Sequence, residues 1–418
     1  MRTSSVASDF RAAAPAKTDL PVYLASRVFG TTGIQIQSLA IGWEVYETTG
    51  SALDLGWVGL AQFLPLMLLS LPAGAVADRL NRKLILAICR IVYTLGALAL
   101  AFASSTSWAP VAGASLLPTF LVLALLGATR AFSFPAASAL LPALVTVDRL
   151  PRAIAMSSTT FQVATIGGPA VGGLIYAAFG AHAAYLTAAA CLAVSGVCVF
   201  SLRTPMPKRA PTTEGPVTRV AHGLRYVFRE KILLGAISLD LFAVLLGGAV
   251  ALMPIFARDI LDVGEMGLGM LRSAPAVGAA ATAAFFAFFP MKRHAGRLMF
   301  SAVALFGGAT VAFGLSESFA LSLFSLAILG GADMVSVVIR QSLIQLRTPD
   351  EMRGRVSSVS YVFIGASNEL GEFESGVTAA WLGTVRAVVL GGVGTLLVTG
   401  LWATMFPDLR RADRLDRS

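Results

Sequence analysis

The feature that most constrains the fold is a succession of long apolar runs separated by short charged turns. Of the 418 residues, 56% are hydrophobic and 13% are charged, whereas soluble domains carry about 25% charged residues. A helix needs about 20 apolar residues to cross a bilayer, so a chain of this length has room for roughly twelve such helices. We therefore predict an all-α membrane protein with twelve transmembrane helices.

The apolar runs set the expected helix positions. The helices are expected at about residues 21–46, 52–77, 84–102, 112–134, 153–179, 183–201, 232–257, 267–289, 298–315, 319–346, 356–382 and 385–405. Pro135 and Pro142 are expected to end the fourth helix, because proline lacks the N–H that a helix interior uses.

One long polar segment separates the sixth and seventh helices. Its first part, residues 205–216, is rich in Pro and Thr and predicts a flexible link. In its second part, residues 217–229, apolar side chains recur on one helical face. They are Val217, Ala221, Leu224 and Phe228. This pattern predicts an amphipathic helix on the inner membrane surface.

The cations lie in every second loop, which sets the orientation. The loops expected inside carry Arg79, Arg82, Lys83, Arg149, Arg152, Lys208, Arg209, Lys292, Arg293, Arg347, Arg353 and Arg355. The loops expected outside carry only Arg258 and Arg386. Short cytoplasmic loops collect Lys and Arg, so both termini are expected in the cytoplasm. The formal charge of +9 is spread over these loops, and we expect no nucleic-acid partner.

The chain contains an internal repeat. Residues 146–154 parallel residues 348–356, an offset of 348 − 146 = 202 residues, about half the chain. Two parallel six-helix repeats produce this arrangement. The expected organisation is a tail (1–19), a six-helix bundle (20–204), a linker with the amphipathic helix (205–231), a second six-helix bundle (232–406) and a tail (407–418). Residues 1–19 contain no apolar signal region, so we expect no cleaved leader.

The turn between the second and third helices carries an ordered motif. Its residues are Gly74, Asp78, Arg79, Arg82 and Lys83. They resemble the loop-2/3 motif of the major facilitator superfamily, G-x-x-x-D-R-x-G-R-R/K, with Asn81 in place of the second Gly. The resemblance implies the major facilitator fold and a gating role in which Asp78 docks at the start of the eleventh helix, or on Arg130, when the cytoplasmic side is shut. The related turn at residues 290–297 keeps the cations and lacks the Asp.

The fifth helix contains a glycine-rich string. Gly168, Pro169, Gly172 and Gly173 lie in it. Small residues allow close approach of a neighbouring helix, whatever the protein does. The string also resembles the helix-5 motif of facilitator antiporters, G-x-x-x-G-P-x-x-G-G, with Ala164 at the first position. That motif occurs mainly in exporters, so the resemblance favours export over import.

Several polar residues lie inside expected helices. They are Arg130, Asp240, Asp333, Arg340, Asn368, Glu369 and Glu372. Charges within a membrane are costly, which points to substrate or proton binding. Two alternatives stay open: the eleventh helix lines water and its carboxylates only solvate it, and Arg340, which shares a face with Asp333, extends toward the inner surface.

The eleventh helix holds the leading candidates for coupling. Asn368, Glu369 and Glu372 project within about 100° of one another on a helix of 3.6 residues per turn. Two neighbouring carboxylates are expected to share one proton and to titrate together. An outgoing cationic or polar substrate would compete with that proton. We expect Glu369, nearest the middle of the membrane, to carry the coupling.

No enzyme signature accompanies these charges. The sequence has three His and no H-E-x-x-H, Ser/His/Asp set or phosphate loop, and its three Cys lack metal-ligand spacing. We expect no cofactor and no metal site. Because no phosphate loop or ATP-binding domain is evident, we expect an ion gradient or the gradient of the substrate to supply the energy for transport.

Together with the loop-2/3 and helix-5 motifs, residues 223–229 resemble the enterobactin-exporter branch, the transmembrane secretion effector group. The resemblance implies a monomeric transporter of the bacterial inner membrane that exports a siderophore or another amphipathic small molecule in exchange for protons. Its expected partners are that small molecule, protons and the lipid bilayer. Alternatives are an importer of a metal chelate or metabolite, and a substrate-sensing facilitator without turnover.

Overall fold

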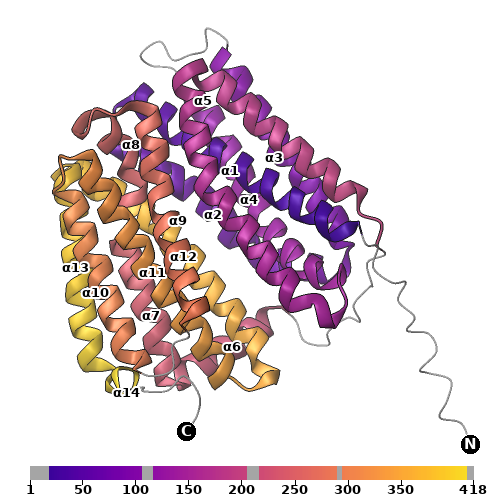
Figure 1. Ribbon diagram of the computed structural model, residues 1–418, viewed down its shortest axis with the longest axis vertical. Coiled ribbons are helices and arrows are strands. Elements are labelled where there is room, and N and C mark those ends of the chain that lie inside the picture. The colour runs from indigo at the N-terminus through magenta and orange to yellow at the C-terminus, as the bar shows by residue number, and fades with distance from the viewer. Residues whose placement is uncertain (1–17, 106–115, 205–215, 290–293, 412–418) are drawn as a thin grey trace, which may run out of the picture.

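The computed structural model describes residues 18–105, 116–204, 216–289 and 294–411 (Figure 1). Within these residues all regular elements are helices, which confirms the predicted all-α class. They are α1 (Asp19–Thr49), α2 (Ala52–Arg79), α3 (Arg82–Ser105), α4 (Leu117–Leu140), α5 (Leu150–Ser201), α6 (Pro216–Arg229), α7 (Lys231–Leu246), α8 (Met253–Ile255), α9 (Gly264–Phe288), α10 (Ala295–Gly314), α11 (Phe319–Arg347), α12 (Asp350–Leu382), α13 (Thr384–Met405) and α14 (Pro407–Arg410), with short 3₁₀ or π turns η1 (Leu141–Ala143), η2 (Val147–Arg149), η3 (Ala249–Leu252) and η4 (Phe256–Ile260).

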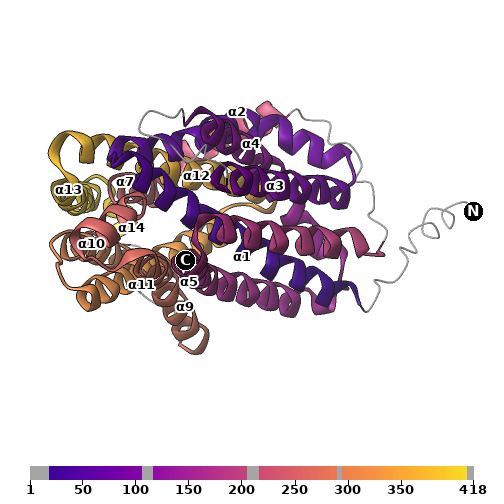
Figure 2. The same ribbon diagram turned by 90° about the horizontal axis from the view of Figure 1, so that it is seen from above.

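The long helices form two bundles. In the N-terminal half, α1 and α3 pack on α5, and α2 packs on α4. In the C-terminal half, α9 packs on α11, α10 packs on α11 and α13, and α7 packs on α12. Figures 1 and 2 show the two halves beside each other, with α1–α5 in indigo to magenta and α9–α13 in orange to yellow. The halves meet where α5 packs on α9 and α2 packs on α12.

One end of the molecule is closed by tight turns built on glycine. Gly50, Gly180, Gly264 and Gly383 all have positive φ, between 61° and 89°, which glycine adopts without steric cost. Gly180 bends α5 by leaving the helical conformation (φ 78°, ψ −179°), so the single long helix holds the expected fifth and sixth helices. We call this the glycine-turn end.

The other end carries the charged connections. These lie at residues 80–81, 141–149 and 348–349, and charged residues such as Arg82 and Arg347 flank or lie within them. The start of α1 is also here, because Asp19 accepts hydrogen bonds from the backbone of Arg203 and Thr204 at 3.0 and 2.7 Å. The C-terminal α14 packs on α7 and α10. We call this the charged-loop end.

Nine candidate membrane spans are evident among the described residues by length and composition. One of them, Leu150–Ser201, contains 52 residues and the bend at Gly180. The long helices α1 and α12 are not among the nine. Both carry several charged side chains, including Glu44 and Glu47 in α1 and Glu369 and Glu372 in α12. The predicted membrane character is confirmed, and the number twelve remains a prediction.

Three local predictions need correction. The fourth helix does not end at Pro135 but continues to Leu140, since neighbouring groups in a membrane bundle compensate for the lost N–H. The expected seventh helix is broken after Leu246, where two glycines precede short 3₁₀, α and π turns. Among the residues of α6 whose side chains are described, Gly223 and Val227 are buried, whereas Ala221 and Phe228 are exposed. Gly223 packs on the Arg355 carbonyl and Val359 of α12, and Leu224 of the predicted face is partly buried against the same core, so the protein contact is shifted from the predicted face and shares Leu224 with it.

Candidate transport site

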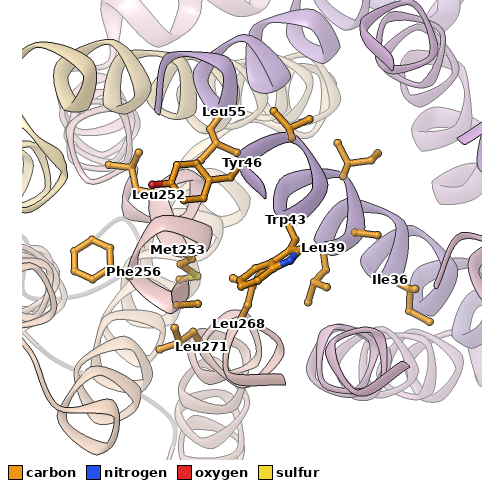
Figure 3. Packing of buried hydrophobic residues seen from close by; sticks show 14 of the residues in the cluster. Ile36, Leu39, Trp43, Tyr46, Leu55, Leu252, Met253, Phe256, Leu268 and Leu271 are labelled. Atoms are coloured by element: carbon orange, nitrogen blue, oxygen red, sulfur yellow. The ribbon is translucent and has the colours of Figure 1, made fainter. Parts of the chain in front are cut away.

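The two halves share one apolar core at the glycine-turn end and have separate cores at the charged-loop end. The shared cluster joins α1, α3, α4 and α5 to α9 and η3. Figure 3 shows Trp43 and Tyr46 of α1 near Met253, Phe256 and Leu268 of the C-terminal half. At the charged-loop end, one cluster belongs to the N-terminal half alone and another to the C-terminal half with α6. Apolar burial therefore holds the halves together at one end.

Glycines allow the helix backbones to meet across this interface. A β-carbon on Gly376 of α12 would lie 2.6 Å from the Cα of Gly56 in α2. A β-carbon on Gly269 of α9 would lie 3.2 Å from the Cα of Gly173 in α5. We call these four residues the glycine seam. Any larger side chain there requires the facing helices to separate.

Polar contacts extend the same interface. The Gln162 side chain donates to the Ala276 carbonyl at 2.7 Å, and the Ser273 hydroxyl donates to the Ile166 carbonyl at 2.7 Å. Both join α5 to α9. The Tyr46 hydroxyl of α1 donates to the carboxylate of Asp259 in η4.

The four residues of the helix-5 string lie between α1 and α9. Gly168 faces Gln35, and Gly172 faces the backbone of Ile36, both in α1. The Pro169 carbonyl and Gly173 face Gly269 in α9. All four members of the string are buried. Gly168 and Gly172 therefore pack within the N-terminal half, and Pro169 and Gly173 pack against the C-terminal half.

Arg130 and Glu369 form an ion pair between the halves. Arg130 lies in α4 and Glu369 in α12, so the pair joins residues 239 positions apart. The Glu369 side chain is 7% exposed and that of Arg130 is 47% exposed. Both residues were predicted as functional, and the structure brings them together. A charge-assisted hydrogen bond of this kind is among the stronger polar contacts in proteins.

The other polar residues of α12 have different surroundings. Glu372 packs on α2, where a β-carbon on Gly59 would lie 3.0 Å from its Oε2. It is also close enough to Glu369, Arg130 and Arg272 to interact electrostatically. Asn368 is exposed. Glu374 accepts a hydrogen bond from the Thr378 hydroxyl at 2.8 Å and stays within its own helix.

A second charged cluster is buried inside the C-terminal half. Arg340 of α11 pairs with Asp240 of α7, and the two side chains are 3% and 7% exposed. The Ser336 hydroxyl donates to Asp240 at 3.3 Å. Asp333 lines a cavity of about 10 Å³ together with Asp240 and Ser336, close to the smallest volume that holds one water molecule. The alternative that Arg340 extends to the membrane surface is wrong, because Asp240 provides a buried partner.

Part of the loop-2/3 motif has described contacts. Lys83 donates to the Leu202 carbonyl at 2.6 Å, and Arg82 reaches the Ala139 carbonyl at 3.5 Å. A β-carbon on Gly74 would meet no described atom of another element within 4 Å. The side chains of Asp78 and Arg79 lie outside the described residues. The predicted docking of Asp78 therefore stays a prediction, and residues 290–293 of the related turn lie outside the described residues.

Sequence reasoning missed a polar layer near the glycine-turn end and the cation Arg90. Glu44 accepts a hydrogen bond from Tyr185, and Glu47 accepts one from Tyr176 at 3.2 Å. Arg90 in α3 lies against Gly30 of α1. Glu44, Glu47 and Arg90 are charged residues within expected membrane helices. The free-energy cost of a charge in the membrane, which singled out Arg130, therefore applies to them as well.

Comparison with known proteins identifies the family. The family described as transmembrane secretion effector matches residues 13–418. The chain belongs to the transmembrane secretion effector family. The multidrug efflux pump Tap of Mycolicibacterium fortuitum is 29% identical over 91% of this chain and 94% of that protein. The enterobactin exporter EntS of Shigella boydii is 25% identical over 93% of this chain and 92% of that protein.

Solved structures agree with this assignment at the level of the fold. A bacterial homolog of the human lysosomal transporter Spinster superposes with a TM-score of 0.71 at 14% identity, covering 94% of this chain and 99% of the other. A POT family transporter in complex with 5-aminolevulinic acid gives 0.72 at 13% identity, with 94% and 97% covered. This transmembrane secretion effector is therefore a major facilitator transporter of the bacterial inner membrane, not an enzyme.

Proposed function

We propose that the protein is a proton-coupled exporter of an amphipathic small molecule that works by alternating access. In this proposal twelve helices cross the membrane as two six-helix repeats, and the charged-loop end with both termini faces the cytoplasm. The distribution of Lys and Arg among the loops supports this orientation. The loop-2/3 and helix-5 motifs and the names of two relatives, an efflux pump and an exporter, support outward transport.

The observation that carries the proposal is the ion pair of Arg130 and Glu369 between the two halves. The two residues belong to helices that separate if the glycine seam opens, since α2 packs on both α4 and α12. Separation leaves a carboxylate without its cation in a membrane, which is unfavourable unless the carboxylate binds a proton. A proton on Glu369 therefore replaces Arg130 as its partner and lowers the cost of opening.

The apolar contacts are consistent with one state of such a cycle. The shared core lies at the glycine-turn end, and the two separate cores lie at the charged-loop end. We infer that this conformation is closed toward the periplasm. In the reverse conformation the glycine seam opens and the charged-loop end closes, with Asp78 as the proposed cytoplasmic contact.

A Glu369→Gln variant tests the coupling. The amide imitates a protonated carboxyl, so the variant is expected to fold but to lose efflux driven by a pH gradient. Glu374→Gln is the matched control, because Glu374 lies on the same helix and its hydrogen bonds, to Thr378 and Ser375, stay within that helix. Efflux of amphipathic dyes is measured in inverted vesicles, and proton release on dye binding is measured with purified protein in weak buffer. Uphill efflux by Glu369→Gln at the control rate refutes the coupling role.

The direction of transport needs a separate experiment. The extracellular and intracellular metabolites of a deletion strain are compared with those of its parent. Export predicts a compound that accumulates inside the deletion strain and declines in the medium. The reverse pattern supports the importer alternative. A change in gene expression without any redistribution supports the sensing alternative.

A further inference from the structure

Three arginines of the N-terminal half lie at one depth in the membrane. Arg27 is eight residues from the start of α1, Arg90 is eight residues from the start of α3, and Arg130 is ten residues before the end of α4. At 1.5 Å per residue these positions lie about 12 to 15 Å from the charged-loop end. Arg90 is close enough to Arg27 to interact electrostatically, and Tyr93 is close to both Arg90 and Arg130.

Only one of these three arginines has a carboxylate partner within the part of the chain that the structure describes. Arg130 pairs with Glu369. The Nε atoms of Arg27 and Arg90 are buried without a hydrogen-bond acceptor, and neither residue forms an ion pair among the described side chains. Among the described side chains, no carboxylate therefore neutralises these two guanidinium groups.

The surroundings hold these two groups within the bundle. The Arg27 guanidinium lies 5.4 Å from the ring centre of Phe161 in α5, a side chain eleven residues into that helix, about 16 Å from the charged-loop end. The Arg90 guanidinium fills the space left by Gly30, where a β-carbon would lie 2.8 Å from its Cζ. A plain surface anchor would extend toward the membrane interface, which neither contact allows.

The carboxylates on α1 are too far away to neutralise these cations. Asp19 is eight residues from Arg27, about 12 Å along the helix, and it bonds to the backbone of Arg203 and Thr204. Glu44 is 44 − 27 = 17 residues away, about 26 Å at the same rise, and it bonds to Tyr185. In the C-terminal half, Asp240 already pairs with Arg340.

We propose that Arg27 and Arg90, beside the Arg130–Glu369 pair, bind the acidic group of the transported molecule, which is an amphipathic organic anion. An isolated Arg at the centre of a membrane helix costs about 2.5–3.5 kcal/mol on insertion scales, and a bound carboxylate, sulfonate or phenolate removes that penalty. Phe161, which is 44% exposed, offers an aromatic surface for the apolar part. This inference rests on the proposed transport function. It predicts a negatively charged substrate, whereas the carboxylates of α12 alone would favour a positively charged one.

An anionic cargo also changes the energetics of transport. The bacterial cytoplasm is electrically negative, so an anion moves outward down the membrane potential, gaining about 2.3 kcal/mol per charge for each 100 mV. Export of a cationic cargo would instead cost the same free energy per charge, because the cation would move against the membrane potential. The membrane potential and the proton bound by Glu369 would then act together on one export step.

A pair of probes with the same aromatic body tests the charge preference. Purified protein in neutral detergent at low salt is titrated with 1-pyrenebutyrate and with (1-pyrenylmethyl)trimethylammonium, and the dissociation constants are measured by fluorescence. We expect the anion to bind at least about tenfold more tightly, the effect of one charge-assisted hydrogen bond. Equal binding of the two probes, or preference for the cation, overturns the proposal without the need for any variant.

Variants then locate the site. Arg27→Gln and Arg90→Gln are each expected to weaken anion binding by about tenfold or more and to leave cation binding unchanged. Gly30→Ala, which displaces the Arg90 guanidinium, is expected to act in the same direction. Arg297→Gln, at an exposed position of α10, removes the same charge elsewhere and is the control. An anion preference that survives in all three test variants refutes this location.

The result is separable from the proposed function. Selective anion binding without efflux in vesicles leaves the site intact and refutes export. Efflux of the cationic probe at the rate of the anionic one leaves export intact and refutes the site.

Discussion

Gly173 provides the sharpest test of the contact between α5 and α9. A β-carbon at this position would lie 2.5 Å from the Glu265 carbonyl oxygen and 3.1 Å from the Cα of Gly269. Ordinary contact begins at 3.4 Å, so Gly173→Ala requires the helices to move apart by about 3.4 − 2.5 = 0.9 Å. Both neighbouring atoms belong to backbone, which cannot rotate away as a side chain can.

The size of the effect follows from the cost of overpacking. Extra methyl or methylene groups in a packed interior cost about 1–3 kcal/mol, and this penalty applies only while the glycine-turn end is closed. A free energy of that size changes a two-state equilibrium by about 5- to 150-fold. We expect Gly173→Ala to shift the population by this factor toward the conformation that is open at the glycine-turn end.

Gly167 supplies a matched control on the same helix. A β-carbon there would meet nothing within 4 Å, so Gly167→Ala adds the helix propensity of alanine without the clash. Spin labels at Thr48 and Glu317, both exposed at the glycine-turn end, report the separation of the halves by pulsed electron paramagnetic resonance in a background without the three native cysteines. Identical distance distributions in the two variants refute the assignment of Gly173 to the closed interface.

Three further predictions concern other parts of the chain. Arg340→Met leaves Asp240 buried without its cation and is expected to cost about 3–5 kcal/mol; the thermal midpoint in detergent should fall and should recover partly when Asp240→Leu is added. Asp78→Asn is expected to reduce transport at unchanged expression, because it weakens the proposed cytoplasmic contact; wild-type efflux in this variant would contradict the gate. A Cys at Thr213 should react with an impermeant maleimide in inverted vesicles but not in intact cells, and labelling in intact cells would reverse the orientation.

Hydrophobic patterning was sufficient for the all-α membrane class because membrane helices are set by local composition. The apolar runs at residues 84–102 and 319–346 predicted both ends of α3 and α11 to within a few residues. Local rules failed where tertiary contacts compensate for a local cost. Pro135 sits inside α4, and the glycines after Leu246 interrupt a run that hydropathy alone would continue. In α6, packing of Gly223 against α12 shifted the contact away from Ala221 and Phe228, while Leu224 of the predicted face still contacts the core.

The candidate site was predictable as a set of residues but not as a set of pairs. The cost of a charge in a membrane singled out Arg130, Glu369, Asp240 and Arg340 without any structure. Sequence spacing relates residues on one helix, so it placed Asp333 and Arg340 on one face, two turns apart, and identified no partner for either. The partner found in the structure lies on another helix, 340 − 240 = 100 residues away. Such pairings depend on helix packing, which a single sequence does not encode in its local pattern.

The arrangement of α12 links the closed interface to the ion pair. Glu369 and Gly376 are seven residues apart, two turns of a helix, and therefore project from the same side. Gly376 meets Gly56 of α2, and α2 packs on α4, the helix that carries Arg130. A rigid α12 cannot withdraw Gly376 from α2 without also changing the distance between Glu369 and Arg130. If Glu369 carries the proton, its protonation and the opening of the glycine seam are two consequences of one helix movement, and a variant that disturbs either contact should alter both.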